Sequence, residues 1–218
     1  MTLKPGTRLL FIGDSVTDCG RLRPIGTGSR DALGKGYIAE VDKLLREVHP
    51  RRPVRITNMG ISGNTVRDLS KRWDEDVLTL APEWLVVMIG VNDVWRQFDW
   101  VNRSGAVLPD DFELTYEMML RRTRPNLKGL VLMTPFYVES DRSDLMRQKI
   151  DAYGAIVKEL ARRHEALLVD TQAAFDRVLR RLDFKLLAAD RVHPTEIGHN
   201  VLAYAFVRAL GISPPRRR

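Results

Sequence analysis

The stretch RLLFIGDS, residues 8–15, decides how this chain folds. Four apolar residues lead without a break into a glycine and two short polar residues. A continuous apolar run is typical of a strand that is covered on both faces, as in a parallel sheet. The Gly-Asp-Ser triplet then ends the strand, and its Asp or Ser can begin a helix as a cap. We therefore expect a buried first strand with a serine at its carboxyl end.

Short apolar runs alternate with longer amphipathic stretches along the rest of the chain. The runs predict strands at 8–13, 54–58, 84–90, 129–134 and 166–170. The stretches between them predict helices at about 36–48, 65–80, 110–124, 143–164, 171–182 and 195–210. A repeated strand-helix order predicts an α/β protein, a three-layer α/β/α sandwich with a parallel sheet. The two long connections, 17–35 and 95–108, are candidate functional loops.

Length and composition indicate one globular domain over residues 1–218, with a core at about 8–210 and a basic tail at 211–218. No apolar run is long enough to cross a bilayer. The first residues do not resemble a signal peptide. Cys19 is the only cysteine, which excludes an intramolecular disulfide and agrees with a reducing compartment. We expect a cytoplasmic protein.

The formal net charge of +7 raises the question of nucleic-acid binding. The basic residues are spread along the chain and mixed with 28 acidic ones. Short clusters occur at 51–52, at 121–122 and in the tail 214–218. No stripe of Lys and Arg is interleaved with stacking aromatic residues, so a solvated surface is the better interpretation. We expect neither a nucleic-acid nor a membrane partner.

Polar motifs follow the predicted strands at the points where the strands end. Ser15 follows the first strand, residues 58–64 the second and residues 90–93 the third, while 190–194 precede the last helix. Ligands of open α/β sheets gather at the carboxyl ends of the strands. Asp190 and His193 are three residues apart, so they can lie on one face of a helical turn. An Asp that orients a His base is what a serine nucleophile needs.

Each motif also has a purely structural interpretation. Ser15 can be part of a helix cap, and Gly60 and Gly63 can be ordinary turn glycines. Asn92 can cap the next segment or donate its side-chain amide to an oxyanion. His193, before a proline, can be a surface residue at a helix start. Their joint presence in this order favours catalysis over the separate structural interpretations.

Four blocks of the sequence resemble the ordered blocks of the SGNH hydrolases, also called GDSL esterases and lipases. The sequences of these blocks are most similar to those of intracellular bacterial acetylxylan esterases of this superfamily. The resemblance extends from about residue 8 to residue 205. The resemblance implies a flavodoxin-like, five-stranded parallel sheet in the order 2-1-3-4-5. The blocks are 13–15, 60–63, 90–93 and 190–193, with further matches at 9–12, 64–69, 94–97 and 133–136.

The resemblance also implies a role for each matching residue. Ser15 becomes the nucleophile, His193 the general base and then acid, and Asp190 the residue that orients His193. The oxyanion hole becomes the N–H groups of Ser15 and Gly63 with the Asn92 side chain, where Gly63 is chosen because the family's donor is the Gly of a Ser-Gly pair. One departure is Ala189, where close relatives often carry an aromatic residue, and it concerns the fine shape of the pocket and leaves the chemistry unchanged.

Other hydrolase folds and catalytic mechanisms agree less well with the sequence. The chain has no Gly-x-Ser-x-Gly elbow, which counts against the α/β-hydrolase fold. Its four histidines show no His-Glu-x-x-His spacing, so we expect no catalytic metal and no cofactor. We interpret Cys19 as a small packing residue, because no histidine or basic cluster is fixed beside it in the sequence.

Residues in and next to the loops that follow the predicted strands are candidates to contact the substrate. Asp14, Trp95, Arg96 and Tyr137 are expected to bind it, and Trp100 lies in the same region; Trp95 and Tyr137 can also simply complete the core. No apolar lid is visible for a fatty acyl chain. We expect a serine carbohydrate esterase that deacetylates a small acetylated sugar, such as an acetylated xylo-oligosaccharide, and that forms a homo-oligomer. A broad short-chain esterase, a thioesterase, a lysophospholipase or a non-catalytic carbohydrate-binding protein remain alternatives.

Overall fold

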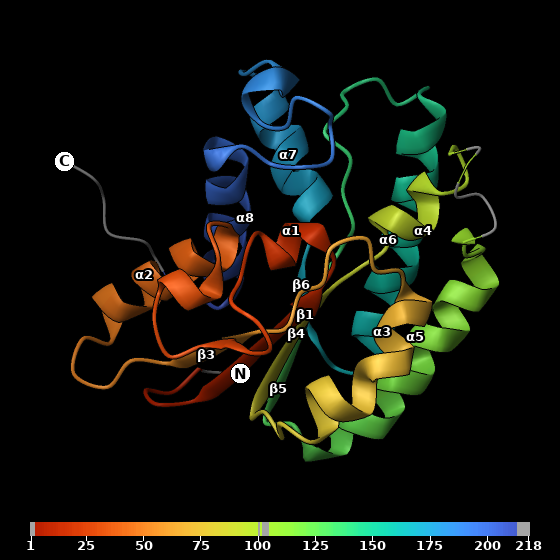
Figure 1. Ribbon diagram of the computed structural model, residues 1–218. Coiled ribbons are helices and arrows are strands. Elements are labelled where there is room, and N and C mark those ends of the chain that lie inside the picture. Colours follow the sequence, from red (N-terminus) through yellow and green to blue (C-terminus); the bar gives the residue numbers. More distant parts are fainter. Residues whose placement is uncertain (1–2, 100, 102–104, 213–218) are drawn as a thin grey trace.

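A six-stranded sheet forms the centre of the molecule in the computed structural model, which describes residues 3–99, 101 and 105–212 (Figure 1). The strand order is β2-β3-β1-β4-β5-β6. The five strands from β3 to β6 run parallel, and β2 pairs antiparallel with β3 at the edge. The strands are β1 (Arg8–Gly13), β2 (Gly26–Thr27), β3 (Arg55–Asn58), β4 (Trp84–Met88), β5 (Gly129–Met133) and β6 (Leu167–Val169).

The apolar runs of the strands are buried on both faces of the sheet. In β1, Leu9 and Phe11 belong to one hydrophobic cluster, while Leu10 and Ile12 belong to a second cluster on the opposite face. The central strands β4 and β5 divide their side chains between the two clusters in the same alternating way. Successive side chains of a strand point to opposite faces, so an unbroken apolar run is what two covered faces require.

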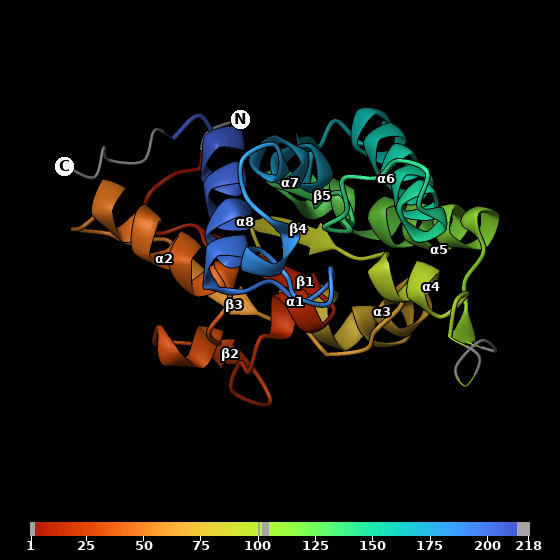
Figure 2. The ribbon, with the colours of Figure 1, turned by 90° about the horizontal axis from the view of Figure 1, so that it is seen from above.

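Helices cover the two faces of the sheet and make the outer layers of the sandwich (Figures 1 and 2). One cluster packs α2, α7 and α8 against the sheet, and the other packs α3, α5 and α6. The helices are α1 (Ser15–Asp18), α2 (Tyr37–Val48), α3 (Val66–Trp73), α4 (Val91–Trp95), α5 (Pro109–Thr123), α6 (Leu145–Arg163), α7 (Thr171–Leu179) and α8 (Glu196–Ala209). Shorter helical turns are η1 (Asp31–Leu33), η2 (Asp74–Leu78), η4 (Arg124–Asn126) and η5 (Phe184–Leu186).

The predicted α/β sandwich is confirmed, and so is the order of the five parallel strands. The predicted strand count was one too low, because β2 is a two-residue antiparallel strand in the long connection 17–35. The predicted helix at 65–80 is α3 followed by a π-helical turn, η2. The short helix α1 begins at the Gly-Asp-Ser turn, where the sequence allowed a helix start, whereas the short helix α4 after the third predicted strand was not predicted. Both carry residues of the candidate site.

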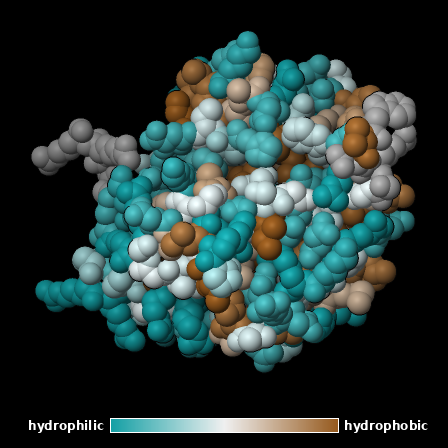
Figure 3. Space-filling view, in the orientation of Figure 1, coloured by the Kyte–Doolittle hydropathy of each residue, from teal (hydrophilic) through white to brown (hydrophobic). Residues whose placement is uncertain are grey.

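The molecule shows a largely polar surface in the view of Figure 3, where hydrophobic residues are scattered among hydrophilic ones. None of the helices in the described part of the chain combines the length and the apolar character that crossing a bilayer requires. The basic tail of the sequence is described only to residue 212, so its last six residues lie outside the described chain.

Candidate active site

The turn after β1 places Ser15 at the start of a short helix. Gly13 is required at the end of the strand, since a Cβ atom there would lie 2.3 Å from the Met88 carbonyl oxygen and 2.5 Å from Thr17 Oγ1. Asp14 is the helix cap, and its side chain accepts a hydrogen bond of 3.1 Å from the N–H of Val16. Ser15 is then the first residue of α1, where backbone N–H groups have no partner within the helix.

The hydroxyl of Ser15 contacts a histidine from the other end of the chain. Ser15 Oγ lies 3.0 Å from His193 Nε2, across 178 positions of sequence. His193 Nδ1 lies 2.6 Å from Asp190 Oδ2. With Nδ1 donating to the carboxylate, Nε2 is free to accept the Ser15 hydroxyl proton. The three residues therefore form one chain of hydrogen bonds from hydroxyl to imidazole to carboxylate.

Asp190 is held in the ionised form that such a chain needs. Its Oδ1 atom accepts the N–H groups of Val192 at 3.0 Å and His193 at 2.8 Å. Burial opposes ionisation, but the hydrogen bonds from the His193 side chain, the His193 N–H and the Val192 N–H together hold the pKa of Asp190 below its usual value. A negative charge next to Nδ1 stabilises the imidazolium that forms when Nε2 takes a proton.

The turn between Asp190 and His193 is fixed from outside by a neighbouring loop. Arg191 has a left-handed backbone, with φ of 66°, which is uncommon for a residue with a side chain. Its carbonyl accepts the Val138 N–H at 2.9 Å, and its Nε forms an ion pair of 2.8 Å with Glu139. These contacts offset the cost of the left-handed conformation and define where the histidine lies.

The loop after β3 leaves one backbone N–H without an acceptor. Ser62 N–H donates to Asp18 Oδ2 at 3.0 Å, and Asn64 N–H donates to the Ile61 carbonyl at 3.3 Å. Between them, the N–H of Gly63 has no acceptor among the described residues. Gly63 has φ of 79°, a conformation that glycine adopts without strain. A Gly63 N–H that is available to donate is the property expected of an oxyanion donor.

Asn92 joins the same loop from the end of the third predicted strand. It is the second residue of α4, a helix that begins directly after Gly90, whose φ of 131° allows the sharp turn from β4. Asn92 Nδ2 donates to the carbonyl of Asn64 at 2.9 Å. The side-chain amide therefore lies next to residues 63–64, and an amide nitrogen has a second N–H that a substrate oxygen can accept.

Two carboxyl groups are buried beneath these segments. Asp14 is 2% exposed and Asp93 is 0% exposed. Burial raises the pKa of each to about 7, and the Asp14 charge adds to the effect on Asp93. Asp93 Oδ1 accepts the N–H of Val66 at 3.0 Å, while Oδ2 has no partner among the described residues. Asp14 was expected to bind substrate, but the structure places its carboxyl group in the interior as a helix cap.

Two of the expected binding residues lie at the end of α4 and have different surroundings. Trp95 is the last residue of the helix, and Arg96 directly follows it. The Trp95 ring is half-buried and lies beside the His193 ring, with centroids 6.3 Å apart. Arg96 was expected to bond substrate hydroxyls, but its Nη2 donates to the Gly63 carbonyl at 2.7 Å, and Nη1 lies 4.0 Å from Asp68. Arg96 therefore supports the loop of Gly63. Trp100 lies outside the described residues.

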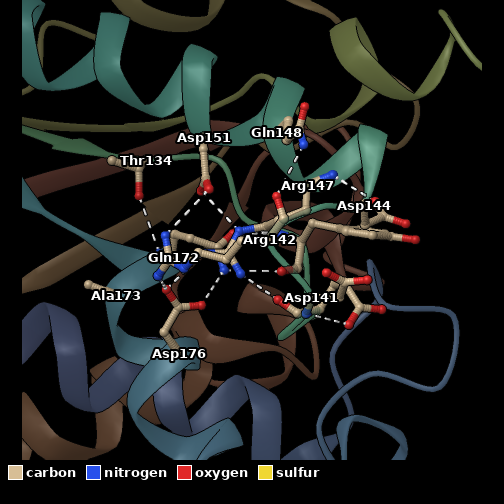
Figure 4. A network of polar contacts seen from close by, with 12 residues as sticks. Thr134, Asp141, Arg142, Asp144, Arg147, Gln148, Asp151, Gln172, Ala173 and Asp176 are labelled. Carbon is tan, nitrogen blue, oxygen red and sulfur yellow. Dashed lines mark hydrogen bonds and ion pairs between the residues drawn. The ribbon is translucent and has the colours of Figure 1, made fainter.

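Tyr137 is fixed through its backbone. Gln172 on α7 accepts the Tyr137 N–H at 2.8 Å and donates to the Tyr137 carbonyl at 3.1 Å. Gln172 also donates to Asp176 at 2.9 Å, and Asp176 pairs with the buried Arg147 at 2.8 Å; Figure 4 shows this network between α6 and α7. The network holds the segment that contacts Arg191, so Tyr137 lies in the loop next to the His193 turn.

Cys19 has a histidine neighbour that the sequence did not reveal. Cys19 Sγ lies 3.5 Å from His199 Nε2, so the interpretation that no histidine lies beside it is wrong. His199 Nδ1 accepts the Tyr37 N–H at 3.1 Å, which leaves the ring proton on Nε2. Burial, with the charge of His193, lowers the pKa of His199 to about 4, and burial raises the pKa of the thiol. Cys19 is therefore a packed, protonated thiol.

The arrangement as a whole fits acyl transfer from an ester. A hydroxyl with a histidine base, an orienting carboxylate and nearby N–H donors are the groups that acyl transfer requires. The described residues contain no group of three or more His, Cys, Asp or Glu side chains that could hold a metal ion. Sequence reasoning missed one residue that contacts several of these segments, Arg72, because two of its partners are backbone carbonyls, which no motif marks.

Comparisons with known proteins agree with this chemistry. Residues 11–201 match the model of the GDSL-like Lipase/Acylhydrolase family. The chain is 51% identical over 219 residues to an acetylxylan esterase of Geobacillus stearothermophilus, covering 100% of both chains. The crystal structure of Axe2, an acetylxylan esterase from that organism, matches with a TM-score of 0.96 and 51% identity over 100% of each chain. LAE5, an alpha/beta hydrolase enzyme from the metagenome of Lake Arreo, Spain, matches with a TM-score of 0.92 and 45% identity, over 96% of this chain and 97% of its own.

Proposed function

The chain belongs to the GDSL-like Lipase/Acylhydrolase family, and from that membership we propose that it removes acetyl groups from acetylated xylo-oligosaccharides or related sugars. It is a carboxylic ester hydrolase that uses a serine, as its full-length relationship to an acetylxylan esterase indicates. The observation that carries the proposed mechanism is the hydrogen-bonded chain from Ser15 through His193 to Asp190, with distances of 3.0 and 2.6 Å.

In the proposed first step, Ser15 Oγ attacks the carbonyl carbon of the acetyl ester. His193 Nε2 takes the hydroxyl proton, and Asp190 stabilises the imidazolium that results. The C–O bond to the sugar then breaks, and His193 returns the proton to the leaving sugar oxygen. The products of this step are a free sugar hydroxyl and an acetyl group bound to Ser15.

In the proposed second step, water replaces the sugar. His193 takes one proton from the water while the water oxygen attacks the acyl carbon, and it then gives this proton to Ser15 Oγ as acetic acid leaves. Each step places negative charge on the carbonyl oxygen. The N–H groups of Ser15 and Gly63 and the amide of Asn92 are proposed to hold that oxygen, and the available N–H of Gly63 supports this assignment.

The preference for a small acyl group on a sugar rests on the surroundings of His193. The half-buried Trp95 ring lies beside the His193 ring, where an aromatic face can stack on a sugar unit. The relative that covers the whole chain carries the name acetylxylan esterase. We propose Trp95 and Tyr137 as substrate-binding residues, and we propose acetyl as the acyl group.

The test combines a substrate panel with variants of one residue. Acetylated xylo-oligosaccharides and p-nitrophenyl acetate, butanoate and octanoate are assayed with the wild-type protein. We expect acetyl esters to be cleaved faster than butanoyl esters, and octanoyl esters hardly at all. Ser15→Ala should lower kcat by several orders of magnitude, whereas Ser70→Ala, at an exposed position of α3, should leave it unchanged.

Each contrary outcome of this test has a meaning. A Ser15→Ala variant that keeps more than about a tenth of the activity removes Ser15 as the nucleophile, since loss of a triad member normally costs far more. A preference for octanoyl esters indicates a lysophospholipase, and faster cleavage of acyl thioesters indicates a thioesterase. A protein that binds sugars but neither cleaves esters nor reacts with a fluorophosphonate is a binding protein.

We also propose that the enzyme is one domain, acts in the cytoplasm and self-associates. Residues from β1 and α8, near the two ends of the described chain, share one hydrophobic cluster, which supports a single domain. The single cysteine, Cys19, supports a reducing compartment. Cell fractionation tests the location, and sedimentation velocity tests the assembly. A single species at the mass of one chain, 24.9 kDa, contradicts self-association.

A further inference from the structure

A single guanidinium group lies behind the segments that carry the proposed oxyanion donors. Arg72 is in the last turn of α3, and its side chain is 14% exposed. Its Nε donates to Asn64 Oδ1 at 2.7 Å, and Nη1 donates to the Met59 carbonyl at 2.8 Å. Nη2 donates to the Gly13 carbonyl at 3.2 Å. Nη1 also pairs with Asp76 on the next helical turn.

These partners belong to both segments that supply a backbone donor. The Gly13 carbonyl ends β1, two residues before Ser15, and also accepts the N–H of Ile61 at 3.1 Å. The Met59 carbonyl begins the loop of Gly63, and Asn64 directly follows Gly63. The third donor is connected as well, because Asn92 Nδ2 binds the Asn64 carbonyl.

We propose that Arg72 is a positioning residue that sets the spacing between the nucleophile turn and the loop of Gly63. This inference rests on the proposed function, because it assigns Arg72 a task in holding the proposed oxyanion hole. Arg72 touches no reacting atom in this assignment. It acts by fixing where the N–H groups of Ser15 and Gly63 point, and displacements of about 1 Å in a preorganised site can cost a factor of about 100 in rate.

The chemistry of arginine explains why this residue type is suited to the position. A guanidinium presents five N–H donors in a rigid plane, so it can bind acceptors from three segments at once. A lysine carries the same charge but concentrates it in one compact ammonium group. Arg72→Lys therefore separates the charge, which the Asp76 pair needs, from the planar set of donors, which the two loops need.

A purely structural role for Arg72 predicts different behaviour. The Arg72–Asp76 pair links residues four apart and joins the last turn of α3 to η2, so it can stabilise this junction on its own. If the pair were the whole purpose, loss of Arg72 would lower the melting temperature and leave kcat of the folded protein unchanged. If Arg72 sets the oxyanion hole, kcat of the folded protein falls while KM changes little.

The first experiment measures kcat and KM on p-nitrophenyl acetate for Arg72→Ala and Arg72→Lys, with thermal unfolding of each variant. We expect kcat to fall by about 10- to 100-fold in both, with KM within about twofold of wild type. Arg121→Ala is the matched control, because Arg121 also pairs with an acidic residue four positions away, at 2.6 Å on α5, but is 74% exposed. Its kcat should be unchanged.

Two further measurements distinguish positioning from general damage. Methylguanidinium added at millimolar concentration should restore part of kcat in Arg72→Ala, where it can replace the missing donors, and should have no such effect on wild type. In the double variant Arg72→Ala/Asn92→Ala, kcat should fall by a smaller factor than the product of the two factors measured for the single variants, because both residues act on one oxyanion hole. If Arg72→Ala does not fold, Arg72→Lys is used in its place, both for the kcat measurement and for the double-mutant comparison with Asn92→Ala.

The inference is overturned if Arg72→Lys keeps kcat within twofold of wild type. It is also overturned if the losses in the double variant multiply fully, or if only KM changes. Failure of the proposed function is a separate result. It would show as activity that Ser15→Ala retains in the same assay, or as a wild-type protein that a fluorophosphonate does not label. An inactive Ser15→Ala with a fully active Arg72→Lys removes only the role of Arg72.

Discussion

Both carboxylate oxygens of Asp190 bind His193, one through the imidazole and one through the backbone. Oδ2 accepts from Nδ1 at 2.6 Å, and Oδ1 accepts from the His193 N–H at 2.8 Å. The spacing of three residues makes this possible within one turn of chain. The carboxylate therefore fixes the position of the histidine backbone and the orientation of its ring at the same time, with Nε2 directed at Ser15.

Replacing this carboxylate by an amide should remove the orienting effect without emptying the space. Asp190→Asn should lower kcat on p-nitrophenyl acetate by about 10³–10⁴, since an amide places neither a negative charge nor a dependable acceptor next to Nδ1. KM should change little. The same change at an exposed helix cap, Asp183→Asn, is the control. A loss of less than tenfold at pH 7 would show that His193 does not depend on Asp190.

The amide of Asn92 is expected to act mainly when charge develops on the substrate. Asn92→Ala removes a donor to the oxyanion, so kcat should fall by about 10²–10³ while KM stays near the wild-type value. Steady-state kinetics on p-nitrophenyl acetate measure both. Asn126→Ala, at an exposed position after α5, serves as the control. A variant with raised KM and unchanged kcat would instead assign Asn92 to substrate binding.

The fold was predictable because its decisive signals are local. The alternation within β1 requires two covered faces, and the structure provides a hydrophobic cluster on each. The motifs at the ends of three strands meet because parallel strands end at one edge, which is a consequence of topology. Strand β2 escaped prediction, because two residues, Gly26 and Thr27, leave no pattern to detect.

The supporting contacts of the site were not predictable for a different reason. Arg96 binds a backbone carbonyl 33 positions away, and Arg72 binds one 59 positions away. Every residue has a carbonyl, so the sequence around an acceptor of this kind carries no mark. The contact of Cys19 with His199 joins α1 to α8 across 180 positions and leaves no spacing to recognise. Asp14 caps α1, and the sequence left this role open beside substrate binding, because a helix cap and a binding residue look alike in sequence.

The role of Trp95 is tested by comparing two acetyl esters of different size. If the ring next to His193 supports a sugar unit, Trp95→Ala should reduce kcat/KM on acetylated xylo-oligosaccharides at least tenfold more than on p-nitrophenyl acetate, since only the carbohydrate substrate can stack a sugar ring on the indole. A single Trp-sized platform corresponds to about 1–1.5 kcal/mol, or roughly tenfold. Equal losses on the two substrates would indicate that Trp95 packs against the core and contributes no binding surface.

The buried carboxyl of Asp93 should make stability depend on pH in a direction opposite to most acidic groups. Its pKa is raised from 3.8 to about 7, first by burial and then by the charge of Asp14. Between these two values the unfolded chain releases the proton while the folded protein keeps it. The folded state then binds more protons, so this group lowers the free energy of unfolding as the pH rises from about 4 to about 7.

The variant Asp93→Asn has the shape of the protonated acid and cannot ionise. Its free energy of unfolding, minus that of wild type, should increase with pH between about 4 and 7, by up to about 1.4 kcal/mol per pH unit, and should level off above pH 7. Urea unfolding at several pH values measures this difference. Glu47→Gln, at an exposed position of α2, controls for the loss of one negative charge. A difference that stays constant from pH 4 to pH 8 would mean that Asp93 is ionised in the folded protein, so that its unpartnered Oδ2 must be solvated or paired in solution.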